Sequence, residues 1–307
     1  MKLSVVTTMY HSGSYISEFY RRVKTSIKKI TSDYEIIFVN DGCPENSLTE
    51  ALEIFRYDEH IKVIDFSKNF GHHKAIMIGL KHSTGDYVFL IDCDLEEKPE
   101  WLEKLWQEIT ADPLLDVVYG IQKSRKGGWF EKISGHFYYK LLNSLIDFQY
   151  QPNTLTARLM TREYINAVIQ YNEKMFDLWC IFIDVGFRQK GISLEKTNKG
   201  SSTYSLKKKI KMGSLTIISS SFKPLTFIGY LGLLFSTISF FWFIYLVVMK
   251  FQSNVPLGWT SLIVSIWLIG GIIMFSISVL GAYIAKIFSE TRNSPSYVIK
   301  KIYEHTT

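Results

Sequence analysis

Residues 87–97 read YVFLIDCDLEE, an apolar run that ends in two aspartates separated by one residue. A run of this length, rich in β-branched and aromatic side chains and bounded by polar residues, predicts a buried strand at residues 87–91. Asp92 and Asp94 would then stand at the carboxyl end of that strand. Ligands of open α/β sheets bind beyond the carboxyl ends of the strands, so the stretch also marks the edge where a ligand is expected.

On both sides of this stretch, short β-rich runs alternate with helical patterns. Strands are predicted at residues 3–9, 34–39, 61–66, 87–91 and 116–119, and helices at 15–29, 48–57, 75–81 and 100–109. Such alternation predicts an α/β domain with a mostly parallel sheet and helices on both faces. The polar residues that follow the strands are expected to converge on one edge of this sheet.

Polar residues also follow the second and third predicted strands. Asp41 lies in the run NDG after the second strand, and residues 67–71, which include Lys68 and Asn69, follow the third. A dinucleotide-binding domain would need the motif GxGxxG after the first strand, where this chain has TMYHSG at residues 8–13. The phosphates of the ligand are therefore expected to be held in another way.

The aspartate pair is a candidate metal site. Two carboxylates that leave one strand end together can bind Mg²⁺ or Mn²⁺ against a diphosphate. The D-x-D spacing is common, and a solvated loop is the alternative interpretation of Asp92 and Asp94. The apolar strand before them favours the metal site, because it delivers both carboxylates to the ligand edge.

Two uncharged stretches near the C-terminus predict membrane-spanning helices. Residues 227–249 and 260–285 carry no formal charge, and as helices they would be about 35 and 39 Å long, enough to cross the hydrocarbon core. The alternative is a buried helix of a soluble core, but such helices are usually shorter and keep a polar stripe. We therefore expect a hairpin of two transmembrane helices, at about 227–249 and 260–285 within a membrane segment at 226–289.

The distribution of cations predicts the orientation of this hairpin. The loop at 250–259 carries one cation, whereas lysines and arginines flank the hairpin on both sides: Lys207, Lys208, Lys209, Lys211 and Lys223 before it, and Lys286, Arg292, Lys300 and Lys301 after it. The positive-inside rule makes both flanks cytoplasmic, and the N-terminus lacks the apolar core of a signal peptide. We expect a cytosolic catalytic domain at 1–205, a basic juxtamembrane segment at 206–225 and a cytosolic tail at 290–307, in an integral protein of a bacterial inner membrane.

The net charge limits which binding partners are expected, and the cysteine content limits whether a disulfide is expected. The net charge of +6 could suggest nucleic acid, but much of the lysine excess adjoins the predicted spans, where membrane lipids are the better partner. Cys43, Cys93 and Cys180 lack metal-ligand spacing and would lie in a reducing compartment, so we expect no disulfide.

Residues 129–148 combine aromatics with cations at helical spacing. They predict either an interfacial helix or an ordinary helix packed on the sheet, and the adjacent anchor favours the first.

The ordered set of motifs resembles the family-2 glycosyltransferases that act on polyprenyl phosphates, which include dolichol-phosphate mannose synthases and bacterial undecaprenyl-phosphate glucosyltransferases. The resemblance runs over nearly the whole chain. Its motifs are LSVV at 3–6, NDG at 40–42, FSKNFGH at 66–72, DCDL at 92–95, RLMTR at 158–162, GSSTYS at 200–205, PL at 224–225, GAYI at 281–284 and NSPSY at 293–297.

This resemblance implies a GT-A type, Rossmann-like domain that uses a divalent metal, and it assigns roles to the motif residues. Asp41 would accept a hydrogen bond from the nucleotide base, and Asp92 and Asp94 would serve the ribose, the diphosphate and the metal. The remaining residues implied are Lys68 and Asn69 on the donor side and Arg158, Lys199, Ser202 and Tyr204 on the acceptor phosphate, with Asp94 and Arg158 as the catalytic pair. For Arg158 the planar guanidinium suits a phosphate, and a surface salt bridge is the alternative.

Four positions depart from the family pattern. The family often has Asp at 156 and Lys at 203, where this chain has Thr156 and Thr203, and Gln or Asp where Glu96 and Glu97 stand. These departures leave the acceptor geometry and the identity of the sugar open. They leave the aspartate pair intact.

The reaction that the resemblance implies is inverting transfer of a sugar from a nucleotide-sugar, with a UDP-sugar as the first candidate, to undecaprenyl phosphate. The product would be a polyprenyl-phosphate-sugar for modifying a cell-envelope glycan. A phosphate monoester is mostly dianionic at neutral pH, so the acceptor needs no general base. The alternatives are a processive polysaccharide synthase, whose extra spans and Gln-x-x-Arg-Trp motif we do not find, and an inactive nucleotide-binding membrane scaffold. A homo-oligomer is compatible with such an anchor.

Overall fold

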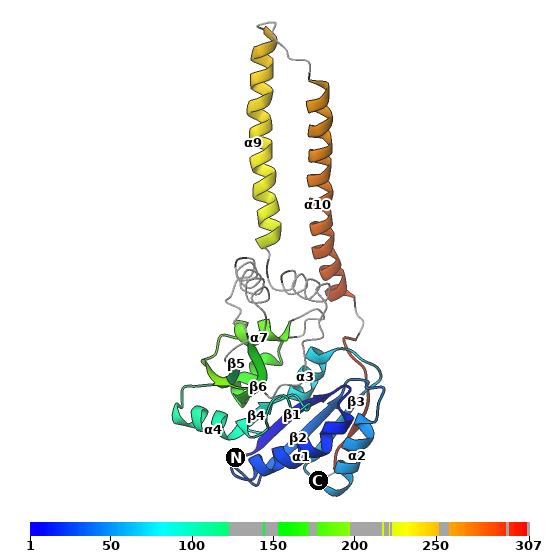
Figure 1. Ribbon diagram of the computed structural model, residues 1–307, viewed down its shortest axis with the longest axis vertical. Coiled ribbons are helices and arrows are strands. Elements are labelled where there is room, and N and C mark those ends of the chain that lie inside the picture. The colour runs from blue at the N-terminus through cyan, green and yellow to red at the C-terminus, as the bar shows by residue number, and fades with distance from the viewer. Residues whose placement is uncertain are drawn as a thin grey trace. The chain divides into compact units, whose positions relative to one another are not determined.

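The computed structural model describes residues 1–122, 144, 153–171, 177–196, 217, 221, 223–251, 258–292 and 295–305. The chain forms two compact units. One comprises Met1–Tyr139, Tyr150–Ser205 and Ser294–Thr307 and contains the sheet, and the other comprises Lys140–Gln149 and Leu206–Asn293 and contains two long helices (Figure 1). Each unit is described by itself below.

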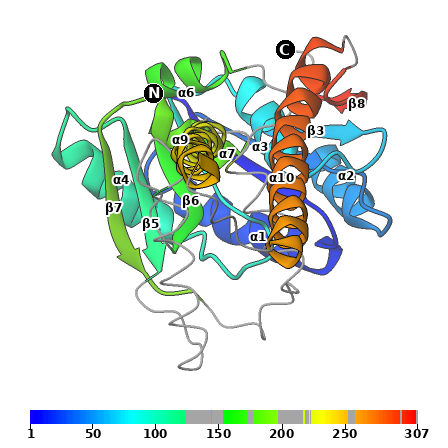
Figure 2. The same ribbon diagram turned by 90° about the horizontal axis from the view of Figure 1, so that it is seen from above.

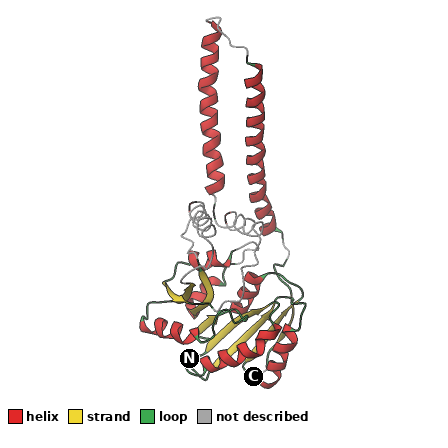
Figure 3. Ribbon diagram, in the orientation of Figure 1, coloured by secondary structure: helices red, strands yellow, loops and turns green. Residues whose placement is uncertain are grey.

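The sheet unit opens with strands and helices in strict alternation. Figure 3 distinguishes its helices, in red, from its strands, in yellow. These elements are β1 (Leu3–Met9), α1 (Gly13–Ile27), β2 (Tyr34–Asn40), α2 (Ser47–Tyr57), β3 (Ile61–Phe66), α3 (His72–Lys81), β4 (Tyr87–Leu90) and α4 (Trp101–Ala111). They are followed by β5 (Val117–Gln122), β6 (Thr154–Thr161), α6 (Arg162–Val168), α7 (Leu178–Asp184), β7 (Gln189–Leu194) and β8 (Ile299–Tyr303). Every strand and helix predicted between residues 3 and 119 is present, with ends that differ by at most three residues.

The strands form one mixed sheet in the order β7-β5-β6-β4-β1-β2-β3-β8, with β7 and β8 at opposite edges (Figure 2). The run β4-β1-β2-β3 is parallel, as predicted. Beside it, β6 pairs antiparallel with β4 and β5, and β8 pairs antiparallel with β3. The predicted fifth strand is therefore not a neighbour of the fourth, because β6 lies between them.

Both faces of the sheet are buried. Every residue of β1 and β2 is buried, which explains their nearly continuous apolar sequence. Side chains from α1, α2 and α4 pack on one face, where Phe19, Ala51 and Leu105 contribute to the core. Those from α3, α6 and α7 pack on the other face, where Ile76 and Ile181 contribute. The predicted helices on both faces are confirmed.

The end of the chain completes the sheet. Strand β8 follows the helical unit in sequence but pairs with β3 along its edge. Just before β8, the carbonyl of Val298 accepts a hydrogen bond from the Ser67 amide at 3.0 Å, and the Tyr297 ring stacks on Phe66 at 6.0 Å between centroids. The tail thus supports the loop that follows β3, an arrangement that was not predicted from the sequence.

The second unit contains α9 (Lys223–Phe251) and α10 (Trp259–Thr291), so both segments predicted as spans are helical. Many apolar side chains of α10 are exposed, among them Met274 at 70%, Ile277 at 61% and Phe288 at 65%. Within the described residues, Leu268–Thr291 is long and apolar enough to cross a membrane, and a window of 18 residues in it has a mean hydropathy of 2.1. A membrane role for α9 stays a prediction.

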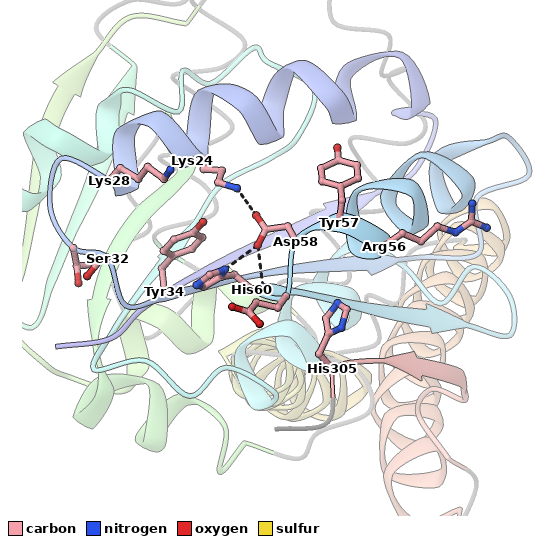
Figure 4. Close-up of a pocket in the computed structure, with 11 residues that line it drawn as sticks. Lys24, Lys28, Ser32, Tyr34, Arg56, Tyr57, Asp58, His60 and His305 are labelled. Atoms are coloured by element: carbon pink, nitrogen blue, oxygen red, sulfur yellow. Dashed lines mark hydrogen bonds and ion pairs between the residues drawn. The ribbon is translucent and has the colours of Figure 1, made fainter.

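A cavity of about 710 Å³ lies at the amino-terminal edge of β2 and β3, away from the predicted ligand edge (Figure 4). Asp58 is the polar centre of this region, and its side chain is 4% exposed. It accepts hydrogen bonds from Lys24 Nζ and the Tyr20 hydroxyl, both at 2.6 Å, and from the backbone and ring nitrogens of His60. Although burial opposes the shift, these bonds hold the pKa of Asp58 well below its usual range.

We expect Asp58→Asn to lower the free energy of unfolding by about 3 kcal/mol, because it leaves Lys24 without its charged partner in a mostly buried site. Since the folded pKa lies below the unfolded value of about 3.9, the stabilisation is present above that pH and is lost as the pH falls below it. Thermal unfolding at pH 7 and below pH 4 tests both statements. The exposed neighbour Glu59 supplies the control, Glu59→Gln; equal melting of the two variants at pH 7 would contradict the role given to Asp58.

Candidate active site

The predicted ligand edge is formed by the carboxyl ends of parallel strands. Asp41 directly follows β2, and Asp92 and Asp94 follow β4 after one further residue. Because β4, β1 and β2 are parallel neighbours, these ends share one edge of the sheet. The structure thus places the three predicted aspartates beyond the same edge.

Asp41 organises the loop at 67–71. Its Oδ1 atom accepts a hydrogen bond from the Phe70 amide at 2.7 Å, and the Gly71 amide lies 3.2 and 3.1 Å from its two oxygens. Burial raises the pKa of Asp41. A carboxylate offers about four acceptor positions, and these two backbone amides use only part of that capacity.

Gly42 explains why a glycine follows Asp41. Its φ is +59°, and a Cβ there would come within 2.3 Å of the Lys68 backbone and 2.4 Å of the Asn69 amide. Only glycine therefore allows the loop to pass so close to the end of β2. The backbones of Lys68 and Asn69, two predicted donor-side residues, are thereby placed next to Asp41.

The aspartate pair lies in a tight turn after β4. Asp94 Oδ1 accepts a hydrogen bond from the Glu96 amide at 2.9 Å, which closes the turn over Leu95. Leu95 has a φ of +62°, a left-handed conformation that costs a branched residue roughly 1–2 kcal/mol. Strain of this kind persists where surrounding contacts hold it and is concentrated at functional sites. Burial raises the pKa of Asp94, and the charge of Asp92 raises it further.

Two residues outside the predicted set contact Asp92. His72 Nε2 lies 3.6 Å from Asp92 Oδ1, and the other ring nitrogen of His72 is 3.0 Å from the Thr8 hydroxyl at the end of β1. On the other side, the Thr156 hydroxyl donates to Asp92 Oδ2 at 2.8 Å. Thr156 is one of the departures from the family pattern, and here it supplies a hydrogen-bond donor where Asp would supply a second negative charge.

Arg158 is buried, so the alternative interpretation of this residue, a salt bridge at the surface, is wrong. Its side chain is almost fully buried, with 2% of the residue exposed. The guanidinium carbon lies 4.0 Å from the centroid of the Phe182 ring and 4.5 Å from that of Trp179, both in α7. Its nitrogens also donate to the carbonyls of Leu155 and Thr156 at 3.3 and 3.4 Å.

We expect Arg158→Lys to lower the free energy of unfolding by about 2 kcal/mol, because an ammonium lacks the planar guanidinium that contacts both rings while donating to two carbonyls. Thermal unfolding of the purified protein measures this change. The exposed Arg188 provides a matched control, Arg188→Lys, which should melt like the wild type. Wild-type melting of Arg158→Lys would show that the guanidinium plane does not matter to the fold.

Several predicted residues lie outside the described part of the chain. These are Lys199, Ser202, Tyr204 and Thr203, the aromatic segment at 129–148 apart from residue 144, and the lysines at 207–211. Their roles stay predictions.

Three residues of this edge have no role that the sequence alone predicts. His72 lies in the motif FSKNFGH, and Glu97 is one of the departures from the family pattern. Lys196 follows β7 and brings its ammonium within 3.3 Å of Glu97 and 3.6 Å of Glu96. A cation 99 residues from its partner carries no local signal, so Lys196 could be found only from the structure.

The order of the sheet and the aspartate pair beyond its parallel strands define a GT-A type fold. The same fold occurs in a mannosyltransferase of Pyrobaculum calidifontis, solved with GDP-Man and Mn²⁺, at a TM-score of 0.50 and 12% identity over 95% of this chain and 88% of that one. This chain belongs to glycosyl transferase family 2, which it matches over residues 4–169.

Relatives resemble the chain over almost its whole length. A protein of Mycobacterium tuberculosis, whose name places it with the glycosyltransferases and gives no substrate, is 42% identical over 99% of this chain and 89% of its own. The bactoprenol glucosyl transferase of Shigella phage SfX is 30% identical over 98% of this chain and 99% of its own. The likeness therefore includes the C-terminal helices as well as the sheet.

Proposed function

We propose that this glycosyltransferase transfers a sugar from a nucleotide-sugar to a polyprenyl phosphate, with inversion at the anomeric carbon, at the cytoplasmic face of a bacterial membrane. The observation that carries the proposal is that one chain contains both a GT-A sheet with paired aspartates at its ligand edge and a helix apolar enough to enter a membrane. The similarity to a bactoprenol glucosyl transferase supports the same acceptor class, because bactoprenol is a polyprenol.

The carboxylate ligands at this edge suit Mg²⁺ or Mn²⁺. Within the described residues, no three His, Cys, Asp or Glu side chains come together as a complete metal cage. Mg²⁺ in such sites is bound by one or two carboxylates and completes its shell with substrate phosphates and water. Asp92 and Asp94 supply two hard oxygen ligands whose mutual repulsion a cation would relieve. We assign the metal to these two residues.

A bound divalent cation would stabilise the charge that develops on the departing nucleoside diphosphate. The other tasks fall to the chain itself. Asp41 would hold the base beside the loop that contains Lys68 and Asn69, where the backbone is already fixed by Gly42. The acceptor phosphate would be held by Lys199, Ser202 and Tyr204, and its own negative charge makes it the nucleophile.

The acceptor is a lipid, so its phosphate would reach the site from the membrane surface. The exposed apolar side chains of α10 would face lipid, and a contiguous apolar surface of this extent is rare in soluble proteins. We propose that α9 also crosses the membrane, which gives a two-helix hairpin with both ends cytoplasmic. The lysines at 207–211 would then meet anionic headgroups.

The release of nucleoside diphosphate tests the proposal. Purified full-length protein in vesicles should release the diphosphate from its nucleotide-sugar only when undecaprenyl phosphate is present. Undecaprenol, which lacks the phosphate, is the control and should give no release. Donor binding without release under any condition would indicate an inactive nucleotide-binding scaffold and would overturn the proposal.

A further inference from the structure

Thr156 stands directly opposite Asp92. The antiparallel register of β4 and β6 pairs Leu90 with Arg158, so two further residues along each strand bring Asp92 beside Thr156. There the Thr156 hydroxyl donates a hydrogen bond of 2.8 Å to Asp92 Oδ2. The bond fixes one carboxylate oxygen, while Asp92 keeps a side-chain exposure of 25% toward the ligand edge.

Glu97 fixes the backbone that carries Thr156. Its side chain is fully buried, and its two carboxylate oxygens accept hydrogen bonds from the Thr156 amide at 3.0 Å and the Ala157 amide at 2.7 Å. The ladder between β5 and β6 is irregular at this point, where the register shifts between Tyr119 and Ile121. Glu97 thus supplies acceptors to two backbone donors at the irregular part of β6.

Lys196 faces the buried Glu97 carboxyl group, whose pKa burial and the charge of Asp92 raise to about 7 against the opposing effect of Lys196. Its ammonium lies 3.3 Å from Glu97 Oε1, and a buried charge requires such a partner. Burial lowers the pKa of Lys196, but Glu97, Asp92 and Glu96 raise it by more, so the ammonium stays charged. The ion pair links the loop after β4 to the segment after β7.

The turn between Asp92 and Glu97 needs external support. It contains Leu95 in a left-handed conformation, which is strained for a branched side chain. Glu97 ends this turn and is held by three donors, and Asp92 begins it and is held by Thr156. Both ends of the strained turn are therefore tied to β6.

We propose that Thr156 and Glu97 are positioning residues that hold the Asp92 carboxylate in the orientation in which it binds the divalent cation. Thr156 acts directly on Asp92, and Glu97 acts through the backbone of Thr156. The proposal rests on the metal site of the proposed function. Outer-shell hydrogen bonds of this kind typically change metal affinity by 10–100-fold.

The test is Mn²⁺ binding by the full-length protein, measured by electron paramagnetic resonance both without donor and with a nucleoside diphosphate present, because substrate phosphates complete the shell of such a metal. Thr156→Val keeps the shape of the side chain and removes its hydroxyl, and it should weaken Mn²⁺ binding about tenfold. Thr156→Ser restores a hydroxyl and should bind within about twofold of the wild type. The melting temperature of the metal-free Thr156→Val protein should match the wild type, because the Asp92 side chain is 25% exposed and water can take the place of the lost hydroxyl.

A double-mutant cycle tests the part played by Glu97. Glu97→Gln should also weaken Mn²⁺ binding, and the double variant Glu97→Gln with Thr156→Val should bind no more weakly than the weaker single variant, because both changes act on the same bond. Fully additive losses would overturn the route through Thr156. Wild-type Mn²⁺ affinity in Thr156→Val would overturn the proposal while leaving the metal site intact, whereas absence of Mn²⁺ binding by the wild type would remove the metal site and the proposal together.

Discussion

Replacing Asp94 by Asn should lower the rate of sugar transfer by about 10³-fold, with Asp92→Asn close behind. Each change removes one of two carboxylates that we assign to the metal, and a metal ion contributes several kcal/mol of charge stabilisation to the transition state. Asn keeps the size of the side chain and one acceptor oxygen, so the turn over Leu95 should survive. The rate is measured as labelled lipid formed in vesicles that contain equal amounts of each protein.

Excess chelator should reduce the wild type to the level of the Asp94→Asn variant, and added Mg²⁺ or Mn²⁺ should restore only the wild type. The matched control is Asp86→Asn: Asp86 precedes β4 at its other end and accepts a hydrogen bond from the Lys2 amide. It should leave transfer within about twofold, since it is remote from the ligand edge. Transfer by Asp94→Asn at the wild-type rate in the presence of chelator would contradict the metal assignment.

Removing the helical unit should separate donor binding from acceptor use. In one variant a flexible linker of about 20 Gly and Ser residues, with an r.m.s. span of about 25 Å, replaces residues 206–293 and joins the two parts of the sheet unit. Donor affinity should change by less than about tenfold, because Asp41, Asp92 and Asp94 all remain. Transfer to membrane-embedded undecaprenyl phosphate should fall by at least about 100-fold, since the enzyme loses its high effective concentration at the membrane.

A truncated variant must keep the C-terminal tail, because the tail contains β8. A chain that ends at residue 205 also loses β8, and with it the edge pairing to β3 and the packing of Tyr297 on Phe66. This shorter variant should melt at a lower temperature than the linked one and bind donor more weakly. A short-chain, water-soluble polyprenyl phosphate is the control acceptor, which both the linked domain and the full chain should use at similar rates. If the linked domain matches the full chain on membrane-embedded acceptor, the helices do not serve acceptor capture.

The central strands could be predicted because their signals are local. The runs at β1, β2, β3 and β4 are short, apolar and bounded by helical patterns, and burial on both faces makes that pattern clear. In contrast, β8 reads IKKIY, with two lysines in five residues, and its partner β3 lies more than 230 residues earlier. An edge strand needs little apolar sequence, so nothing local indicates it.

The same distinction applies to the site. Asp92 and Asp94 were predicted from the strand that precedes them, and the edge that they share with Asp41 follows from parallel pairing. The contact between Thr156 and Asp92 joins residues 64 apart and depends on the insertion of β6 beside β4. Strand order is a property of the whole sheet, and for this reason no spacing in the sequence reports that contact.

The most direct test of the central claim is the mass of the lipid product. Membranes that contain the full-length chain are incubated with undecaprenyl phosphate and a panel of nucleotide-sugars, and the extracted lipids are analysed by mass spectrometry. The account predicts that at least one donor gives undecaprenyl phosphate carrying a single sugar residue, and that membranes with Asp94→Asn do not form it. Lipids that carry long sugar chains, or no new lipid with any donor, would contradict it.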